Sequence, residues 1–309
     1  MLLGIHTYSF YMHGLGQAWA GFRLPWPRQL STVELFDRLT DLGLDGVQLD
    51  DAVLERLDPA YVRSIGAAAK ARGLFLEYNF SMDMGRNGIG RQHEIRDAIE
   101  TARLLGADVL KVGLDLNRPR PLAASRFHPA VTARLKHAAQ QITAAEPHLA
   151  AAGIKLAVEN HCDTFAEEII WLLDRVASPH VGACIDTVNA LMVTEDPMRA
   201  VAQLAPRAFT NHFKDHRIVP QRYGCKVQGT ALGEGDIDLQ RACDLIKTLS
   251  PTRRIIIETE MDIPTDDKAA ALAMEMDTVR RSIRYCREVL KIQVEPDERT
   301  NRPAESRIS

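Results

Sequence analysis

The sequence has little of what marks a secreted, membrane-spanning or disulfide-rich protein. Its five cysteines are widely spread and form no C-x-x-C pair, which argues against a disulfide framework and against a clustered structural zinc site. No run of about 18 apolar residues is present, so no membrane-spanning helix is expected. The N-terminal residues also lack a basic region followed by an apolar stretch. We therefore expect a cytoplasmic protein without a membrane partner.

The sequence also lacks an excess of charge of one sign. Its 38 basic and 41 acidic residues are interspersed, and the formal net charge is -3. A chain of this kind has no long-range attraction for polyanions, so we expect no nucleic-acid partner. The apolar share of 46% and the charged share of 26% are typical of a globular protein that buries a large core.

Short apolar runs rich in Val, Ile and Leu alternate with longer amphipathic segments. This alternation is typical of βαβ units, in which a parallel sheet is covered by helices. Gly73, Gly106 and Gly153 each lie between an amphipathic segment and an apolar run, where glycine commonly ends a helix. The pattern repeats eight times and predicts strands at residues 3–7, 46–49, 75–79, 109–112, 155–159, 181–186, 208–212 and 254–258.

Eight such units favour closure into a (β/α)8 TIM barrel. A doubly wound open sheet is the alternative, but its first strand usually leads into a Gly-rich phosphate loop, whereas here it leads into His6 and Thr7. We expect one domain over residues 1–290 and a flexible, charged tail over residues 291–309. Two long segments, residues 11–30 and 217–238, follow strands and therefore belong to the C-terminal face, where barrel active sites are built.

Four late strands each end in a side chain that commonly binds metal ions. The four residues are Glu159, Asp186, His212 and Glu258. A polar group at the end of an apolar strand is costly unless it is paired, and neighbouring parallel strands lie about 4.8 Å apart. The four side chains can therefore converge on one ion at the mouth of the barrel.

Three carboxylates and one imidazole, without a thiolate, form an oxygen-rich ligand set. We expect a divalent metal ion, with Mn²⁺ as the first choice and Mg²⁺, Co²⁺ or Zn²⁺ as alternatives. Such an ion would act as a Lewis acid on adjacent oxygens of a sugar. Glu260 has the same strand parity as Glu258, so it remains an alternative ligand on the last strand; we prefer Glu258 because it directly ends the apolar run.

These strand ends resemble the xylose isomerase-like TIM barrels, a family that includes sugar epimerases, hydroxypyruvate isomerase, inosose dehydratase and endonuclease IV. The resemblance spans residues 2–289. Its specific parts are Glu-Asn-His at residues 159–161, Ile-Asp-Thr-x-Asn at 185–189, His-x-Lys-Asp at 212–215, Leu-Gly-Glu-Gly-Asp at 232–236, and Glu258. The resemblance implies that Glu159 and Glu258 bind the metal and exchange the substrate proton.

The chain departs from the epimerase pattern at one position. The epimerases usually carry a histidine three residues after the aspartate of the sixth strand, and this chain has Asn189 there. This departure bears on the epimerase reading more than on the metal site. The additional histidines and the basic face of the endonuclease branch are not evident in the sequence.

Five further residues are predicted to bind substrate. Lys111 interrupts an apolar strand and either meets an anionic substrate group or pairs with Glu77 or Glu159. The parity of His161 and Lys214 matches that of the ligands two residues before them. His6 lies at the end of the first strand, and a core histidine is its alternative interpretation. The set is His6, Lys111, His161, Lys214 and Arg217.

The combined pattern predicts a metal-dependent carbohydrate enzyme. Our first expectation is the isomerisation or epimerisation of a ketose, with Glu159 and Glu258 as base and acid and the ion holding the enediolate. The first alternative is the decarboxylation of a 3-oxo sugar acid such as 3-oxo-isoapionate, and the second is the dehydration of a keto-inositol. Cleavage of abasic DNA and sugar binding without turnover rank lower. We leave a homo-oligomer open.

Overall fold

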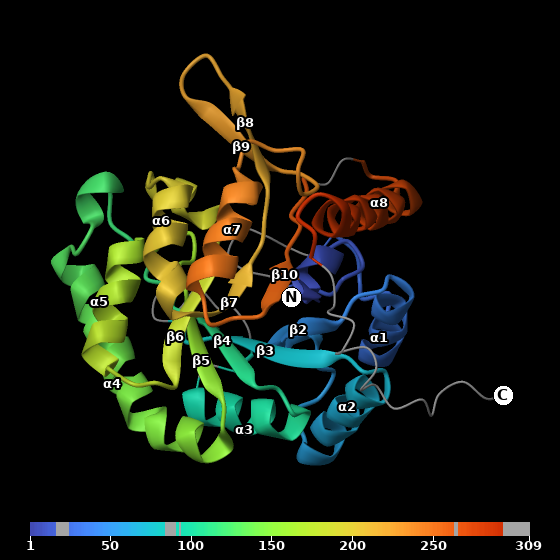
Figure 1. Cartoon of the computed structure of the whole chain (residues 1–309), viewed down its shortest axis with the longest axis horizontal. Coiled ribbons are helices and arrows are strands. Elements are labelled where there is room, and N and C mark those ends of the chain that lie inside the picture. The colour runs from blue at the N-terminus through green and yellow to red at the C-terminus, as the bar shows by residue number, and fades with distance from the viewer. Residues whose placement is uncertain (17–24, 84–90, 93, 263–264, 293–309) are drawn as a thin grey trace.

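The computed structural model describes residues 1–16, 25–83, 91–92, 94–262 and 265–292. Eight parallel strands form a nearly closed barrel with helices around it, which confirms the expected (β/α)8 architecture (Figure 1). Each expected strand is present, and its ends lie within two residues of the expected ones. In sheet order the strands are β10 (Arg254–Ile257), β1 (Leu2–His6), β2 (Gly46–Asp50), β3 (Phe75–Ser81), β4 (Val109–Gly113), β5 (Lys155–Glu159), β6 (Val181–Asp186) and β7 (Ala208–His212).

The barrel closes between β7 and β10 largely through one side chain. The amide of Asn211 donates from Nδ2 to the carbonyl of Arg254 at 2.9 Å and accepts from the backbone N–H of Ile256 at 3.1 Å. Beyond it, the N–H of Phe213 donates to the carbonyl of Ile256 at 2.8 Å. The N–H of Glu258 in turn donates to the carbonyl of Phe213 at 3.1 Å, so the Asn211 side chain and this short backbone bridge together hold the ends of β7 and β10 side by side.

Helices cover the outside of the strands, and local sequence signals set their ends. Ser31 and Glu34 form a capping box at the start of α1. Gly106 and Gly153 end α3 and α4 with φ of 74° and 67°, a left-handed conformation that glycine adopts without strain. The helices are α1 (Thr32–Asp41), α2 (Pro59–Ala71), α3 (Ile95–Leu105), α4 (Pro129–Ala152), α5 (Ala166–Val176), α6 (Pro197–Leu204), α7 (Leu239–Leu249) and α8 (Lys268–Glu288).

The segment after β7 is not a plain Gly-rich loop. It forms an antiparallel hairpin of β8 (His216–Pro220) and β9 (Cys225–Gly229), which projects away from the barrel (Figure 1). The sequence pattern did not predict these two strands. Of their residues only His216 is buried, so the strands carry no apolar alternation.

Two expectations, on membrane-spanning helices and on the C-terminal tail, can be compared with the structure only over the described residues. No helix in the described part of the chain is long and apolar enough to cross a membrane. Of the expected tail at residues 291–309, only Lys291 and Ile292 belong to the described residues, and Ile292 is buried against the barrel.

Candidate metal and substrate site

The strand ends bring the four predicted ligands to one place at the mouth of the barrel. Glu159, Asp186 and His212 are the last residues of β5, β6 and β7, and Glu258 directly follows β10. Register places Asp186 beside His212 on neighbouring strands. The side chains of all four residues are buried. Together with Lys214 they form what we call the mouth cluster.

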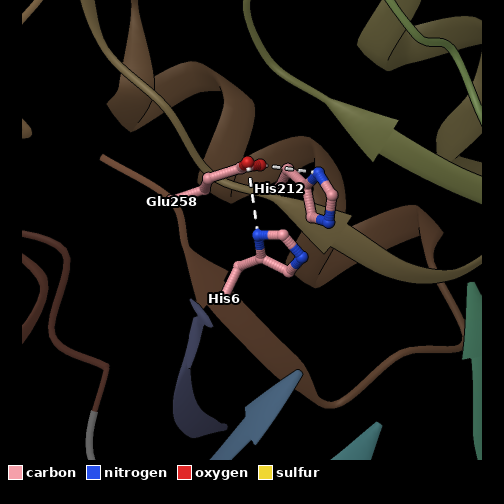
Figure 2. A group of neighbouring side chains, drawn as sticks. All are labelled: His6, His212 and Glu258. Atoms are coloured by element: carbon pink, nitrogen blue, oxygen red, sulfur yellow. Dashed lines mark ion pairs between the residues drawn. The ribbon is translucent and has the colours of Figure 1, made fainter. Parts of the chain in front are cut away.

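His212 is the centre of the mouth cluster. Its Nδ1 lies 2.9 Å from Oε1 of Glu159, 2.7 Å from Oε2 of Glu258 and 3.8 Å from Oδ2 of Asp186. Figure 2 shows the Glu258 carboxylate facing the neighbouring rings of His212 and His6, and Nδ1 of His6 is 3.3 Å from Oε1 of Glu258. One imidazole nitrogen therefore faces three carboxylates.

This arrangement shifts the pKa values of the groups in opposite directions. Burial alone would lower the pKa of His212, but the adjacent charges of Glu258 and Glu159 outweigh burial and raise it to about 9. Burial would raise the pKa of each glutamate, yet neighbouring cations hold both pKa values well below the ordinary range. In the protein without a metal ion, the protonated His212 ring and the neighbouring lysines thus balance the charges of the carboxylates.

Two buried lysines neutralise part of the negative charge. Lys111 forms an ion pair with Oε2 of Glu159. The Nζ atom of Lys214 lies 3.2 Å from Oδ2 of Asp186, 3.3 Å from Oε2 of Glu258 and 2.7 Å from Oε1 of Glu260. Lys111 was predicted either to contact substrate or to pair with a glutamate. The ion pair with Glu159 is present, and the lysine also lines the cavity at the mouth.

The mouth cluster has the donor atoms that a divalent ion needs. One atom of each predicted ligand is buried and makes no hydrogen bond of normal geometry within the described part of the chain: Glu159 Oε2, Asp186 Oδ2, His212 Nδ1 and Glu258 Oε2. Charged neighbours in the site lie close to these atoms, but a bound divalent ion would give each of them a directed partner. Donor atoms of Glu159, Asp186 and His212 lie within 4.8 Å of one another, and His6, His212 and Glu258 form a second group of this kind. The residues fit a divalent ion.

A small polar cavity opens beside the mouth cluster. Its volume is about 70 Å³, and a second cavity of about 30 Å³ adjoins it behind Lys111. Asn79, Lys111 and His161 line both of them. The larger cavity is also lined by His6, Tyr8, Glu159, His212, Lys214, Glu258 and Glu260.

Four of the five predicted substrate residues lie at this cavity, and one does not. His6, Lys111, His161 and Lys214 line it. Burial lowers the pKa of His6 to about 4, so its ring is neutral at pH 7. Arg217 instead lies exposed on β8, where its guanidinium donates to the carbonyl of Glu234 at 3.0 Å. Its neighbours give no support to a substrate contact.

Glu258 and Glu260 take different positions. Glu258 lies inside the mouth cluster, whereas the Glu260 side chain is 36% exposed and pairs with Lys214 and with His216 at 3.3 Å. Burial would raise the pKa of Glu260, but the charge of Lys214 lowers it to about 2. This geometry favours the choice of Glu258 as the ligand on the last strand.

Sequence reasoning overlooked two residues near the cavity. Asn79 donates from Nδ2 to Oδ2 of Asp50 at 2.8 Å, while its Oδ1 is buried and makes no hydrogen bond to the described residues. Tyr8 lies on the short helix after β1. The rule that identified Glu159 would also have identified Asn79, because it stands at the expected end of the third strand. Tyr8 gave no comparable signal.

Comparisons with known proteins agree with the fold. Residues 36–288 match the model of a family described as xylose isomerase-like TIM barrels. A 3-oxo-isoapionate decarboxylase of Pectobacterium atrosepticum is 25% identical over 259 residues, which cover 83% of each chain.

Two solved structures show the same fold at low sequence identity. A D-psicose 3-epimerase, solved in the presence of D-fructose, superimposes with a TM-score of 0.65 at 15% identity and covers 94% of this chain and 99% of its own. A barrel protein of Mycobacterium smegmatis in complex with magnesium gives a TM-score of 0.63 at 15% identity, with 91% and 97% covered. At such identities the likeness concerns the fold alone.

Proposed function

Because the chain belongs to the xylose isomerase-like TIM barrel family, we propose that it is a divalent-metal-dependent enzyme that decarboxylates an oxo-sugar acid. The observation that carries this choice of reaction is the pair of buried lysines, Lys111 and Lys214, among the carboxylates of the mouth. The relative that decarboxylates 3-oxo-isoapionate supports the same choice. The sequence alone placed isomerisation first, and the lysines lead us to reverse that order.

The ligands of the proposed ion are Glu159, Asp186, His212 and Glu258. Their buried atoms without hydrogen bonds support this set, and the oxygen-rich composition favours Mn²⁺, with Mg²⁺, Co²⁺ or Zn²⁺ as alternatives. A bound divalent ion supplies a positive charge next to a substrate oxygen that becomes negative during the reaction.

The charges of the site suit an anionic substrate. Four carboxylates, including Glu260, would repel a sugar acid if only one divalent ion opposed them. Lys111 and Lys214 add two positive charges, so with the ion the charges balance and a substrate carboxylate is not repelled. A neutral ketose needs no such balance. The lysines therefore fit a sugar acid better than a neutral sugar.

In the proposed reaction the bond between the carboxylate carbon and its neighbouring carbon breaks, and CO2 leaves. The electron pair passes to the adjacent carbonyl oxygen, and a proton is then added to the carbon that lost CO2. Lys111 and His161 line both cavities and are placed to orient the substrate, with His6 beside them. Glu159 and Glu258 both contact His212 Nδ1, and one of these ionised carboxylates would pass a proton taken up from solvent to that carbon.

Isomerisation or epimerisation of a ketose is the second candidate. The observation that favours it is the same pair, Glu159 and Glu258, at 2.9 and 2.7 Å from His212 Nδ1. Two carboxylates around one substrate carbon are what removal and return of a proton require. The cavity is lined by both glutamates, so they would face a substrate bound there in either reaction.

The test is turnover in D2O by the Mn²⁺-supplemented protein, followed by NMR, with matched ketoses and 3-oxo sugar acids. We expect CO2 from an oxo acid, with deuterium only on the carbon that lost it and only in the product. Deuterium next to the carbonyl of an unreacted or isomerised ketose, without release of CO2, would establish the second candidate instead. No turnover of either class would contradict both.

A further inference from the structure

Beneath His212, inside the barrel, a buried polar network runs toward the opposite end of the strands. We call it the floor network. Its two central residues, Gln48 on β2 and Glu77 on β3, are fully buried, and they lie below the polar strand ends at Asp50 and Asn79. Its members are the buried Gln48, Glu77 and Thr210, the partly exposed Arg254, and the exposed Asp108 at its outer end.

The hydrogen bonds of the floor network have one consistent direction. His212 Nε2 lies 2.7 Å from Gln48 Oε1, and Gln48 donates from Nε2 to Glu77 Oε2 at 2.9 Å. Thr210 donates its hydroxyl to the same oxygen of Glu77 at 2.6 Å, and Arg254 donates to the other oxygen at 3.2 Å. Every neighbour that contacts the Glu77 carboxylate therefore donates to it.

This direction determines which nitrogen of His212 carries a proton. Because Glu77 accepts, the NH2 group of Gln48 must face Glu77, and the Gln48 oxygen must face His212. An amide oxygen can only accept, so the proton of a neutral His212 ring must be on Nε2. Nδ1, the atom that faces the three carboxylates of the mouth cluster, then keeps its lone pair.

We propose that Glu77, acting through Gln48, holds His212 in the tautomer that binds the metal ion. The inference rests on the metal site proposed above, and it makes Glu77 and Gln48 positioning residues that touch neither substrate nor ion. An imidazole ligand whose second nitrogen donates to an oriented acceptor binds metal more tightly, and losing that partner typically weakens binding 10- to 100-fold.

The decisive variant is Glu77→Gln. Its amide oxygen must face Arg254, because an NH2 group there would oppose the guanidinium, so its NH2 faces Gln48. The side-chain amide of Gln48 must then flip: its oxygen accepts from the new NH2 group at position 77, and its own NH2 faces His212 Nε2. The neutral ring would carry its proton on Nδ1, where the ion has to bind. We expect the Kd for Mn²⁺, measured by calorimetry on the full chain, to rise about 10- to 100-fold.

A double exchange separates positioning from mere stability. In Gln48→Glu with Glu77→Gln, the carboxylate at position 48 accepts from His212 Nε2 and from the new amide, whose oxygen accepts from Arg254. All partners are again satisfied, and His212 Nε2 again donates to position 48 although the bond between positions 48 and 77 is reversed, so the Kd should return to within a few-fold of the unchanged protein. Thr210→Val is the control: it removes one donor to Glu77 without turning Gln48, and should lower Tm while leaving the Kd unchanged.

The outcomes of this series distinguish the two proposals. If the unchanged protein does not bind Mn²⁺, the metal site itself is refuted. If it binds and Glu77→Gln binds equally well, the metal site stands and the positioning role is refuted. A Kd that follows Tm across all variants, Thr210→Val included, also refutes it. Should Glu77→Gln fail to fold, Gln48→Met, which removes the acceptor at similar volume, must weaken Mn²⁺ binding for the inference to survive.

Discussion

The floor network and the mouth cluster are both groups of buried charges in one barrel, yet they differ in completeness. In the floor network, Glu77 receives hydrogen bonds at both oxygens, and Arg254 pairs with Asp108 as well and lies 4.2 Å from the ring centre of Phe75. In the mouth cluster, four ligand atoms have charged neighbours at ion-pair distance but make no hydrogen bond of normal geometry within the described part of the chain. A protein tolerates such atoms where a ligand completes them. A complete set of hydrogen bonds thus distinguishes the supporting network from the proposed binding site.

The largest effect should come from removing a mouth carboxylate. Asp186→Ala deletes a proposed ligand, and we expect loss of bound Mn²⁺ together with activity. Metal content after gel filtration measures the first and turnover the second. Asp196→Ala is the matched control, since Asp196 is exposed and caps α6 on the outside of the barrel. Full metal content in Asp186→Ala would show that the ligand set is wrong.

A change that keeps the shape of a mouth residue should separate chemistry from binding. Glu159→Gln retains an oxygen ligand but cannot transfer a proton, so we expect some metal to remain while turnover falls about 10²- to 10⁴-fold. Steady-state kinetics with saturating Mn²⁺ provides the measurement. Turnover within a few-fold of the unchanged enzyme would remove Glu159 from the proton transfer.

A substitution in the floor network should instead lower the free energy of unfolding. Arg254→Met leaves the Glu77 carboxylate buried without its cation, and breaking a buried ion pair in this way costs about 3 kcal/mol of unfolding free energy. Urea unfolding of the metal-free protein measures this loss, and Mn²⁺ binding should persist. If Arg254→Met instead loses Mn²⁺ binding and keeps its stability, the floor network and the mouth cluster do not differ in the way described.

Within the mouth, Lys111→Met should discriminate between substrates. The lysine provides a charge for a substrate carboxylate, and a hydrogen bond to a charged group contributes about 1.5 to 3 kcal/mol, or roughly 10- to 100-fold in KM. We expect this rise for an oxo-sugar acid and a much smaller one for a neutral ketose. Equal changes for both substrates would make Lys111 a structural partner of Glu159.

The smallest effect is expected at Arg217. Its exposed guanidinium contacts Glu234 on the hairpin side and not the cavity. Arg217→Ala should therefore leave both kcat and KM for the oxo-sugar acid within about twofold, in the range usual for surface substitutions. A KM increase comparable to that of Lys111→Met would extend the site onto the hairpin.

The sequence alone determined the architecture and the composition of the mouth. Apolar runs of strand length that alternate with amphipathic segments record a local periodicity, so the strands and the closing glycines could be read directly. Glu159, Asp186, His212 and Glu258 could be selected because each ends such a run. Their convergence followed from the barrel geometry, in which parallel strands end on one face.

Only the tertiary structure decided how these groups interact. Strand parity could not separate Glu258 from Glu260, and only the end of the apolar run favoured Glu258. The sequence also could not place Arg217, which lies on a strand without an apolar signal. It offered Glu77 only as an alternative partner of Lys111 and gave no role to Gln48; the two lie on separate strands and join His212 only when β2, β3 and β7 close around one core. Periodicity is a property of neighbours in the chain, whereas hydrogen-bond direction and charge balance depend on groups that meet only after folding.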